Sequence, residues 1–202
     1  MPQARTRRNR GPAAAPANRD ALIAAGRRLF AREGYEVPLS AIAREAGVGQ
    51  GVLYRHFPDR LSLALAVFTE TIDALAAVAA EPTDASRLGR LVDRLIQDVL
   101  DNAAFVDAVV NARHLPEFDG EARIRALLAD PLAHEQAEGR VRPDLTVEDL
   151  MLLIRCVYGC VRTQPEGAEE SPAPGRLVAL VDPGLARLVD RAAAARPRRG
   201  LV

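Results

Sequence analysis

Apolar residues recur at intervals of three and four along most of this 202-residue chain, and no segment alternates convincingly between apolar and polar residues. One continuous apolar stripe along a helix, for example, is formed by Leu61, Leu65, Phe68, Ile72 and Leu75. Glycines and prolines interrupt the pattern at points where helices end. The sequence therefore predicts an all-α protein. We expect helices near 18–34, 38–46, 50–57, 59–81, 84–101, 103–113, 119–138, 146–163 and 175–190, the last broken or bent at Asp182-Pro183-Gly184.

Composition narrows the class of protein further. An apolar share of 49% and a charged share of 27% are those of an ordinary globular chain, not of a disordered one. No apolar run reaches the roughly 18 residues of a membrane helix, because Arg155 interrupts the best candidate. No apolar stretch follows the N-terminal arginines as in a secretory signal. Cys156 and Cys160 cannot build a disulfide framework, so a cytoplasmic location without a membrane segment is expected.

Charge is divided unevenly, although the net charge is zero. Residues 1–60 hold 11 arginines against 5 acidic residues, whereas residues 61–202 hold 16 arginines against 22 acidic residues. The first 60 residues are therefore basic and the remainder is acidic, which suggests that only the first part of the chain binds a polyanion. Residues 1–17 carry four of these arginines without any periodicity and are expected to form a flexible arm. The arm either contacts the minor groove or phosphates of DNA or remains a solvated tail.

Residues 38–57 are predicted to form two short helices separated by a tight turn. The turn falls at Ala46-Gly47-Val48, as in a helix-turn-helix. Leu53 and Phe57 share the inward face of the second helix, which leaves Arg55 on an outward face with almost no acid. A helix that enters the major groove with its N-terminal end needs such a surface. The same spacing also fits a helical hairpin inside an unrelated bundle, and the turn alone does not decide between the two.

A longer stretch, GYEVPLSAIAREAGVGQGVLYRHFPDR, resembles the DNA-binding signature of the tetracycline-repressor (TetR) family of bacterial transcription regulators. The matching pieces are Gly34-Tyr35, Ile42-Ala43, Ala46-Gly47-Val48 and Leu53-Tyr54-Arg55-His56-Phe57. The resemblance implies a helical homodimer with an N-terminal three-helix DNA-binding head and a C-terminal helical-bundle body for regulation and dimerisation. The expected division is a flexible arm at 1–17, the helix-turn-helix domain at 18–62, the ligand-binding and dimerisation domain at 63–190 and a disordered tail at 191–202.

The resemblance also implies which residues contact double-stranded DNA. These residues are Gln50, Gly51, Val52, Tyr54, Arg55, His56 and Arg60. Gln50 and Gly51 match positions that contact base edges, and Val52 is placed to touch a thymine methyl group. Tyr54 and His56 match positions that usually meet phosphates. A glutamine pairs well with adenine edges, so changing Gln50 is expected to alter sequence preference.

Three positions in this region need separate comment. Arg60 matches a basic residue that commonly holds the DNA backbone, so its loss is expected to weaken binding to all sequences alike. Three roles are compatible with Arg55, which can bind guanine, bind phosphate or remain solvated. For His56, the alternative to a phosphate contact is an imidazole that packs inside the protein. Gly49 stands where the family often has Ser or Thr. The third helix therefore lacks a side-chain cap, which costs only a few tenths of a kcal/mol.

A second stretch, RPDLTVEDLMLLIRCVYGCV, resembles the penultimate long helix of family members, which pairs with the last helix across the dimer. Our candidate dimer interface is a small-residue stripe on this helix, formed by Leu152, Cys156, Gly159 and Cys160. The rival hypothesis, a metal or redox pair of the two cysteines, finds no histidine or carboxylate cluster to complete it. We therefore predict neither a metal nor a cofactor. The break at Pro183 departs from the family, whose last helix usually runs unbroken.

Candidate ligand-binding residues of the body are Phe105, Val106, Val109, His114, Leu127, Met151, Arg155 and Tyr158. Most of them are equally compatible with an ordinary core. Arg155 lies in an apolar run, where a charge is costly unless paired. It either binds an acidic ligand or pairs with a carboxylate of this chain.

The resulting hypothesis is a ligand-responsive regulator, a repressor, which binds a palindromic operator as a dimer and is released by an unidentified small-molecule inducer. The helix at 59–81 is expected to couple the two parts, by contacts to the head through Leu61 and Leu65 and to the body through Ile72 and Leu75. The alternative is a DNA-binding interaction protein that localises a protein partner without a small ligand. An enzyme is not expected, because the chain has no HExxH motif, no phosphate-binding glycine loop and only three scattered histidines.

Overall fold

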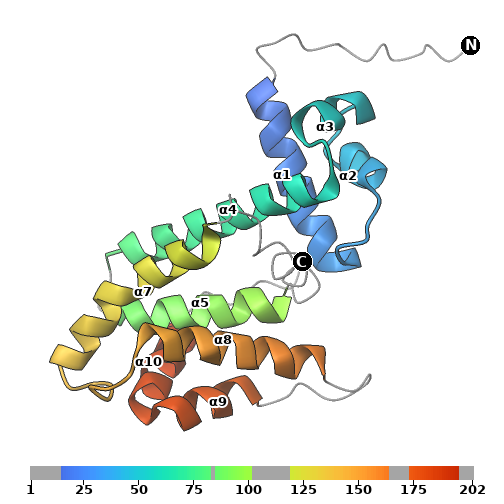
Figure 1. Cartoon of the computed structure of the whole chain (residues 1–202). Helices are drawn as coiled ribbons and strands as arrows, with labels where there is room; N and C mark the ends of the chain where they lie inside the picture. The colour runs from blue at the N-terminus through green and yellow to red at the C-terminus, as the bar shows by residue number, and fades with distance from the viewer. Residues whose placement is uncertain (1–14, 83–84, 102–118, 164–172, 196–202) are drawn as a thin grey trace, which may run out of the picture. The chain divides into compact units, whose positions relative to one another are not determined.

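The computed structural model describes residues 15–82, 85–101, 119–163 and 173–195, and every regular element in these ranges is an α-helix (Figure 1). The all-α prediction is confirmed. The chain divides into two compact units, residues 1–67 and 68–202. Helix α4 (Arg60–Ala80) contributes residues to both units.

The first unit contains α1 (Ala15–Glu33), α2 (Leu39–Glu45), α3 (Gln50–His56) and the start of α4. Helix α1 packs on both α2 and α3. The large buried side chains of this unit are Leu22, Ile23, Leu29, Phe30, Val37, Ile42, Leu53, Phe57, Leu63 and Val67. A Cβ atom added at Gly26 would lie 3.4 Å from Val67 and 3.5 Å from Leu63, so the start of α4 packs directly on α1.

Helix α4 uses different faces along its length, which differs from the single predicted stripe. Leu63 and Val67 are buried in the first unit, whereas Leu61 and Leu65 are only half-buried. Farther along, Ile72 and Leu75 are buried as predicted. The helix was expected to contact the first part through Leu61 and Leu65, but Leu63 and Val67 are buried there instead, because these two side chains face α1 at Gly26. At its beginning, the backbone N–H of Ser62 donates to the Asp59 side chain at 2.7 Å, so Asp59 caps α4.

The second unit contains the rest of α4 and five further described helices. These are α5 (Arg87–Asp101), α7 (Gly120–Ala137), α8 (Val147–Arg162), α9 (Ala173–Val181) and α10 (Pro183–Ala195). Helix α5 packs on α7, α8 and α10, so it supplies the centre of the core. Its buried residues include Leu88, Leu91, Val92, Leu95, Ile96 and Val99. Helix α8 begins with a capping box, in which Thr146 and Asp149 each bond the backbone N–H of the other.

The predicted break in the last helical segment is confirmed between α9 and α10. Asp182 is 3% exposed and accepts hydrogen bonds from the backbone N–H of Leu185 at 2.6 Å and of Arg142 at 3.0 Å. Pro183 then occupies the first helical position, where its missing N–H costs nothing. Asp182 thus caps α10 and holds the loop between α7 and α8 to it.

Helices α5 and α10 approach each other most closely at Gly89. A Cβ atom there would lie 2.5 Å from the carbonyl oxygen and 2.7 Å from the carbonyl carbon of Leu188. Only a residue without a side chain fits this contact. The N–H of Gly89 donates to the Ser86 hydroxyl at 3.0 Å, and that hydroxyl donates to the buried carboxylate of Glu135 at 2.7 Å. Glu135 also pairs with Arg140, which ties the start of α5 to the end of α7.

Several predicted boundaries shift. Helix α1 begins at Ala15 rather than at Asn18, because Ala15 and Ala17 favour a helix and Pro16 is tolerated in its first turn. Residues 1–14, the rest of the expected arm, lie outside the described residues. The last helix continues to Ala195 instead of ending near 190, since Ala192 is buried. Residues 196–202 and the helix expected at 103–113 also lie outside. The division of units falls after Val67 rather than after 62, because Leu63 and Val67 pack on α1.

The expectation that no apolar run reaches the length of a membrane helix holds for uninterrupted runs, but one helix passes a test of length and composition. Helix α4 has 21 residues and is long and apolar enough to cross a membrane by length and composition alone. We required an uninterrupted apolar run, but Glu70 and Asp73 are too few charges to make this helix polar. A core helix passes the same test, and α4 contributes Leu63, Val67, Ile72 and Leu75 to buried positions.

Candidate nucleic-acid interface

The turn between α2 and α3 has the geometry that the helix-turn-helix prediction requires. Gly47 adopts a φ of +68°, a left-handed conformation that favours glycine, and it ends α2. Gly49 occupies the N-cap of α3 with extended backbone and no side-chain hydrogen bond, so α3 is uncapped as predicted. Leu53 and Phe57 are 0% and 3% exposed, which confirms the predicted inward face. The hydrophobic anchor of α3 therefore fixes which side of this helix faces outward.

The outward side of α3 is open and carries no acidic residue. Gln50, Gly51, Tyr54 and Arg55 are exposed, and nothing lies within 4 Å of a Cβ atom added at Gly51. Val52 and His56 are half-buried at the edges of this surface. The His56 ring lies beside the Phe57 ring, with 6.3 Å between their centroids, so this imidazole is partly packed. Of the predicted base-contacting positions, Gln50 and Gly51 are thus exposed, whereas Val52 is half-buried.

Arg60, the predicted backbone contact, is already engaged within the first unit. One guanidinium nitrogen lies 2.5 Å from a carboxylate oxygen of Glu36, and the other donates to the Glu36 carbonyl at 3.3 Å. The guanidinium lies over the Tyr35 ring, 5.3 Å from its centroid. Burial raises the pKa of the Tyr35 hydroxyl, partly opposed by the charge of Arg60. The sequence analysis missed Glu36, because a contact across 24 positions depends on how the chain returns from α1 to α4.

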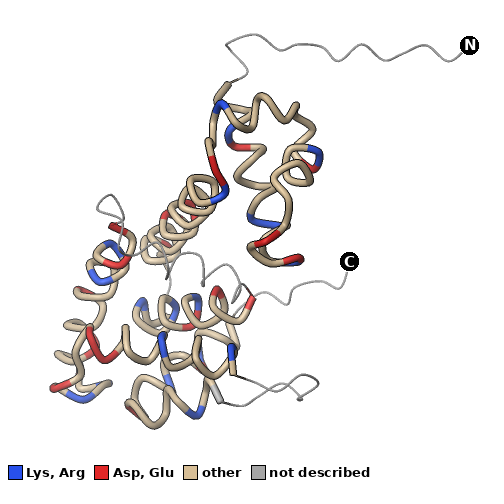
Figure 2. The backbone as a smooth tube through the Cα atoms, turned by 45° about the vertical axis from the view of Figure 1, so that its right-hand side comes forward, with Lys and Arg blue, Asp and Glu red and all other residues tan. Residues whose placement is uncertain are grey.

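Other charged residues of the first unit hold its helices together. Arg28 on α1 pairs with Glu45 at the end of α2 at 3.1 Å, and Arg32 pairs with its neighbour Glu33 at 2.6 Å. Arg19 lies over the Phe57 ring, 5.4 Å from its centroid. Figure 2 shows both signs of charge along the helices of this unit, in contrast to the acid-free α3. The basic character is therefore not spread evenly over the first unit.

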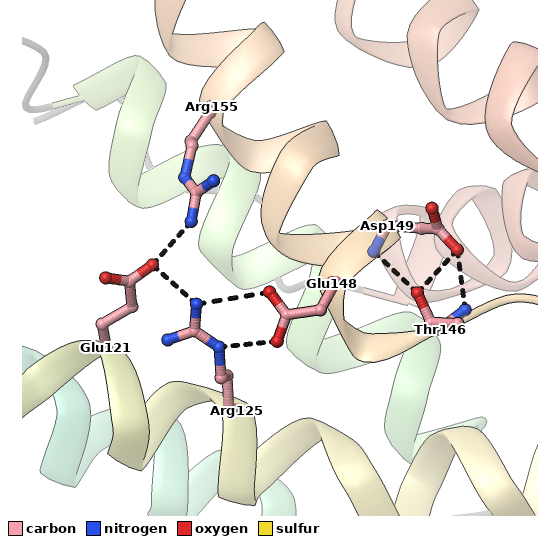
Figure 3. A network of polar contacts seen from close by, with 6 residues as sticks. All are labelled: Glu121, Arg125, Thr146, Glu148, Asp149 and Arg155. Atoms are coloured by element: carbon pink, nitrogen blue, oxygen red, sulfur yellow. Dashed lines mark hydrogen bonds and ion pairs between the residues drawn. The ribbon is translucent and has the colours of Figure 1, made fainter.

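In the second unit, Arg155 has a carboxylate partner within the chain. It donates to Glu121 on α7 at 2.6 Å (Figure 3). Arg125 also reaches Glu121 at 3.0 Å and bonds Glu148 on α8 at 2.9 Å. Partial burial raises the pKa of Glu121, but Arg155 and Arg125 outweigh it and hold that pKa below its ordinary value. Of the two alternatives for Arg155, the carboxylate pair is therefore the one present in this structure.

The other predicted body residues are dispersed. Met151 is buried, whereas Leu127 and Tyr158 are half-buried and pack against the core. Phe105, Val106, Val109 and His114 lie outside the described residues. On the predicted interface stripe, Leu152 is 55% exposed, Cys156 is exposed and Gly159 and Cys160 are half-buried. Leu180 on α9, which sequence reasoning missed, is 73% exposed. Within the described ranges, no three His, Cys, Asp or Glu residues gather in a group that could hold a metal ion.

Comparison with known proteins agrees with the helix-turn-helix geometry. A family model described as "Bacterial regulatory proteins, tetR family" matches residues 22–67, which extend from the first buried residue of α1 into the start of α4. A helix-turn-helix transcriptional repressor from Mycobacterium tuberculosis is 26% identical over 174 residues, covering 82% of this chain and 90% of the relative. The similarity thus extends well beyond the first unit.

Solved structures show the same extent of similarity. A TetR transcription regulatory protein from Mycobacterium vanbaalenii is 30% identical with a TM-score of 0.59, covering 74% of this chain and 96% of the other. A γ-butyrolactone receptor is 25% identical with a TM-score of 0.57, covering 89% of this chain and 96% of the other. These likenesses span both units of the chain.

Proposed function

Because this chain belongs to the TetR family of bacterial transcription regulators, we propose that it is a cytoplasmic, ligand-responsive repressor that binds a palindromic operator as a homodimer. The observation that carries the proposal is the exposed, acid-free outer side of α3 behind a fully buried Leu53. A regulator reads DNA with such a helix inserted into the major groove. The relatives are named regulators, which supports a role in binding rather than in catalysis.

Within the interface, each side chain has a distinct proposed role. Gln50 and Gly51 contact base edges, because they are exposed at the N-terminal end of α3 and a glycine lets the backbone approach closely. Val52 touches a thymine methyl group from its half-buried position. Tyr54 and Arg55 are exposed later on the helix and contact phosphate, with guanine as the alternative for Arg55.

His56 and Arg60 complete the proposed phosphate contacts. Both are half-buried, so their positions are more restricted than those of the fully exposed residues. Restricted side chains lose less freedom on binding. The N-terminal arginines of residues 1–17 add charge to the same unit, and we propose that they strengthen its attraction to DNA.

The homodimer is proposed to form through α8 and the last helical segment. Leu152 and Leu180 are the large apolar side chains most exposed on the described part of the second unit. Burial of exposed leucines at a two-fold interface removes apolar surface from water. Two DNA-binding heads must also lie about 34–36 Å apart to meet successive major grooves, which a dimer achieves.

The effector is proposed to be a small molecule bound by the second unit. The γ-butyrolactone receptor among the structural relatives supports a small-molecule effector, since a γ-butyrolactone is a small molecule. The proposed lining residues are Leu127, Met151 and Tyr158 with Phe105, Val109 and His114. Arg155 joins them only if a ligand displaces Glu121, its present partner.

Helix α4 is the proposed coupling element, since it supplies buried residues to both units. Leu63 and Val67 serve the first unit, and Leu75 belongs to the core of the second. Asp73 on α4 also pairs with Arg123 on α7 at 2.5 Å. A ligand that binds better to one arrangement of α4 shifts the population of DNA-binding states by no more than its difference in affinity.

The test is selection of duplexes from a random pool by the full chain at low ionic strength, followed by titration of the selected operator. Arg55→Ala is expected to weaken operator binding. Arg87→Ala, which removes the same charge from an exposed site on α5, is the matched control and is expected to bind normally. Failure of the wild type to enrich any duplex would refute DNA binding. Release of operator by a metabolite from a small-molecule library supports the inducer, whereas binding of a metabolite without any change in operator affinity contradicts it.

A further inference from the structure

The Arg60 guanidinium is held in a defined place by three contacts from one short segment. Glu36 supplies a carboxylate oxygen at 2.5 Å and a carbonyl oxygen at 3.3 Å, and Tyr35 supplies the ring beneath. The Arg60 side chain is 29% exposed, whereas the Glu36 side chain is 83% exposed. The arginine is thus fixed against the protein, while its acidic partner remains in solvent.

The Glu36 carboxylate resembles a DNA phosphate in what it offers to Arg60. Carboxylate and phosphate oxygens both accept charge-assisted hydrogen bonds from the planar guanidinium group. An exposed ion pair is weak, because solvent screens it, so its carboxylate is readily exchanged for another anion. Tyr35 and the carbonyl of Glu36 do not depend on that carboxylate and can keep the arginine in place during the exchange.

We propose that Glu36 is a positioning residue of the DNA interface, which occupies Arg60 in the free protein and yields it to a backbone phosphate when DNA binds. This inference rests on the proposed DNA-binding function. The exchange lowers affinity for every sequence equally, because a phosphate carries no sequence information. Glu36 thereby restrains non-specific binding without affecting the base contacts made by α3.

The experiment measures binding of the full chain to a random-sequence 30-base-pair duplex over a series of salt concentrations. Glu36→Gln keeps an oxygen that can accept from Arg60 but removes the competing charge. It is expected to tighten binding by about two- to five-fold, the range of an exposed ion pair. Glu33→Gln is the matched control, since it makes the same charge change in the same unit at a carboxylate paired with Arg32. It is expected to have a smaller effect.

The role of Arg60 is tested in the same series. Arg60→Ala is expected to reduce the slope of log K against log salt by about 0.9, the loss of one phosphate contact. In the Arg60→Ala background, Glu36→Gln is expected to have no more effect than Glu33→Gln, because the two residues act through each other. A purely structural ion pair would change thermal stability but not the salt slope.

The possible failures are distinguishable. If the wild type binds no duplex, the proposed function fails and this inference with it. If the wild type binds but Glu36→Gln binds more weakly, or equals Glu33→Gln, then Glu36 does not compete for Arg60. An unchanged salt slope for Arg60→Ala would equally overturn the inference, because Arg60 would then not reach a phosphate. Thermal melts of each variant confirm that the compared proteins are folded.

Discussion

Substitution of Gly89 by alanine tests the closest helix contact of the second unit. The added Cβ atom would stand 2.5 Å from the Leu188 carbonyl oxygen, well inside contact distance, and its neighbour is backbone rather than a flexible side chain. Overpacking of this kind costs about 1–3 kcal/mol. Alanine regains about 1 kcal/mol over glycine within a helix. We therefore expect Gly89→Ala to lower the free energy of unfolding by up to about 2 kcal/mol.

Gly175→Ala is a matched control for this substitution. Gly175 is also the third residue of its helix, α9, but nothing lies within 4 Å of a Cβ atom added there. This variant is expected to gain about 0.5–1 kcal/mol, since only the helix propensity changes. Urea unfolding followed by circular dichroism, at one protein concentration, measures both variants against wild type. Equal or greater stability of Gly89→Ala than of Gly175→Ala would show that α5 and α10 are not in this close contact.

Three further perturbations address other parts of the chain. Leu53→Ala is expected to destabilise the first unit by about 2–5 kcal/mol and to abolish operator binding. Thermal melts and binding titrations measure the two effects. Native DNA affinity in a stably folded Leu53→Ala variant would contradict this prediction. Burial raises the pKa of Glu135, but Arg140 and Ser86 hold it below its ordinary value of 4.5, so its stabilising effect is present above that pH and is lost as the pH falls through the lowered pKa. Denaturant midpoints from pH 7 to 3 are expected to fall more steeply for wild type than for Glu135→Gln, and parallel profiles would refute this. Leu152→Glu is expected to dissociate the proposed dimer in sedimentation experiments. Leu100→Glu, at a 39% exposed leucine of α5, is the control and is expected to leave the dimer intact. If neither variant dissociates the dimer, the interface lies elsewhere.

Much of the fold was predictable because its signals are local. Gly34 and Gly47 end α1 and α2 with positive φ angles, and Asp182 with Pro183 starts a new helix, so each boundary depends on one or two residues. The rotation of the buried stripe on α4 was not predictable from spacing alone. The spacing of three and four residues places Leu61 and Leu65 on the same stripe as Ile72 and Leu75, and only the fold reveals that Leu63 and Val67 are the residues buried in the first unit.

The candidate interface was predictable in part for the same reason. The inward pair Leu53 and Phe57 determines by helical geometry which side of α3 is exposed. The engagement of Arg60 by Glu36, and of Arg155 by Glu121, joins residues that are 24 and 34 positions apart. Such pairs depend on the tertiary arrangement, and many other carboxylates of this chain were equally available in the sequence.

The interruption at Pro183 separates two helices that differ in how freely their sequences can change during evolution. Helix α10 is confined by Asp182, Leu188 and the contact at Gly89, so few sequences are compatible with it. Helix α9, with Leu180 turned to solvent, has no such constraint at that position. In the proposed homodimer, mutations on this short segment would therefore change which paralogue a subunit recognises, and newly duplicated genes would avoid mixed assemblies without changes to the core.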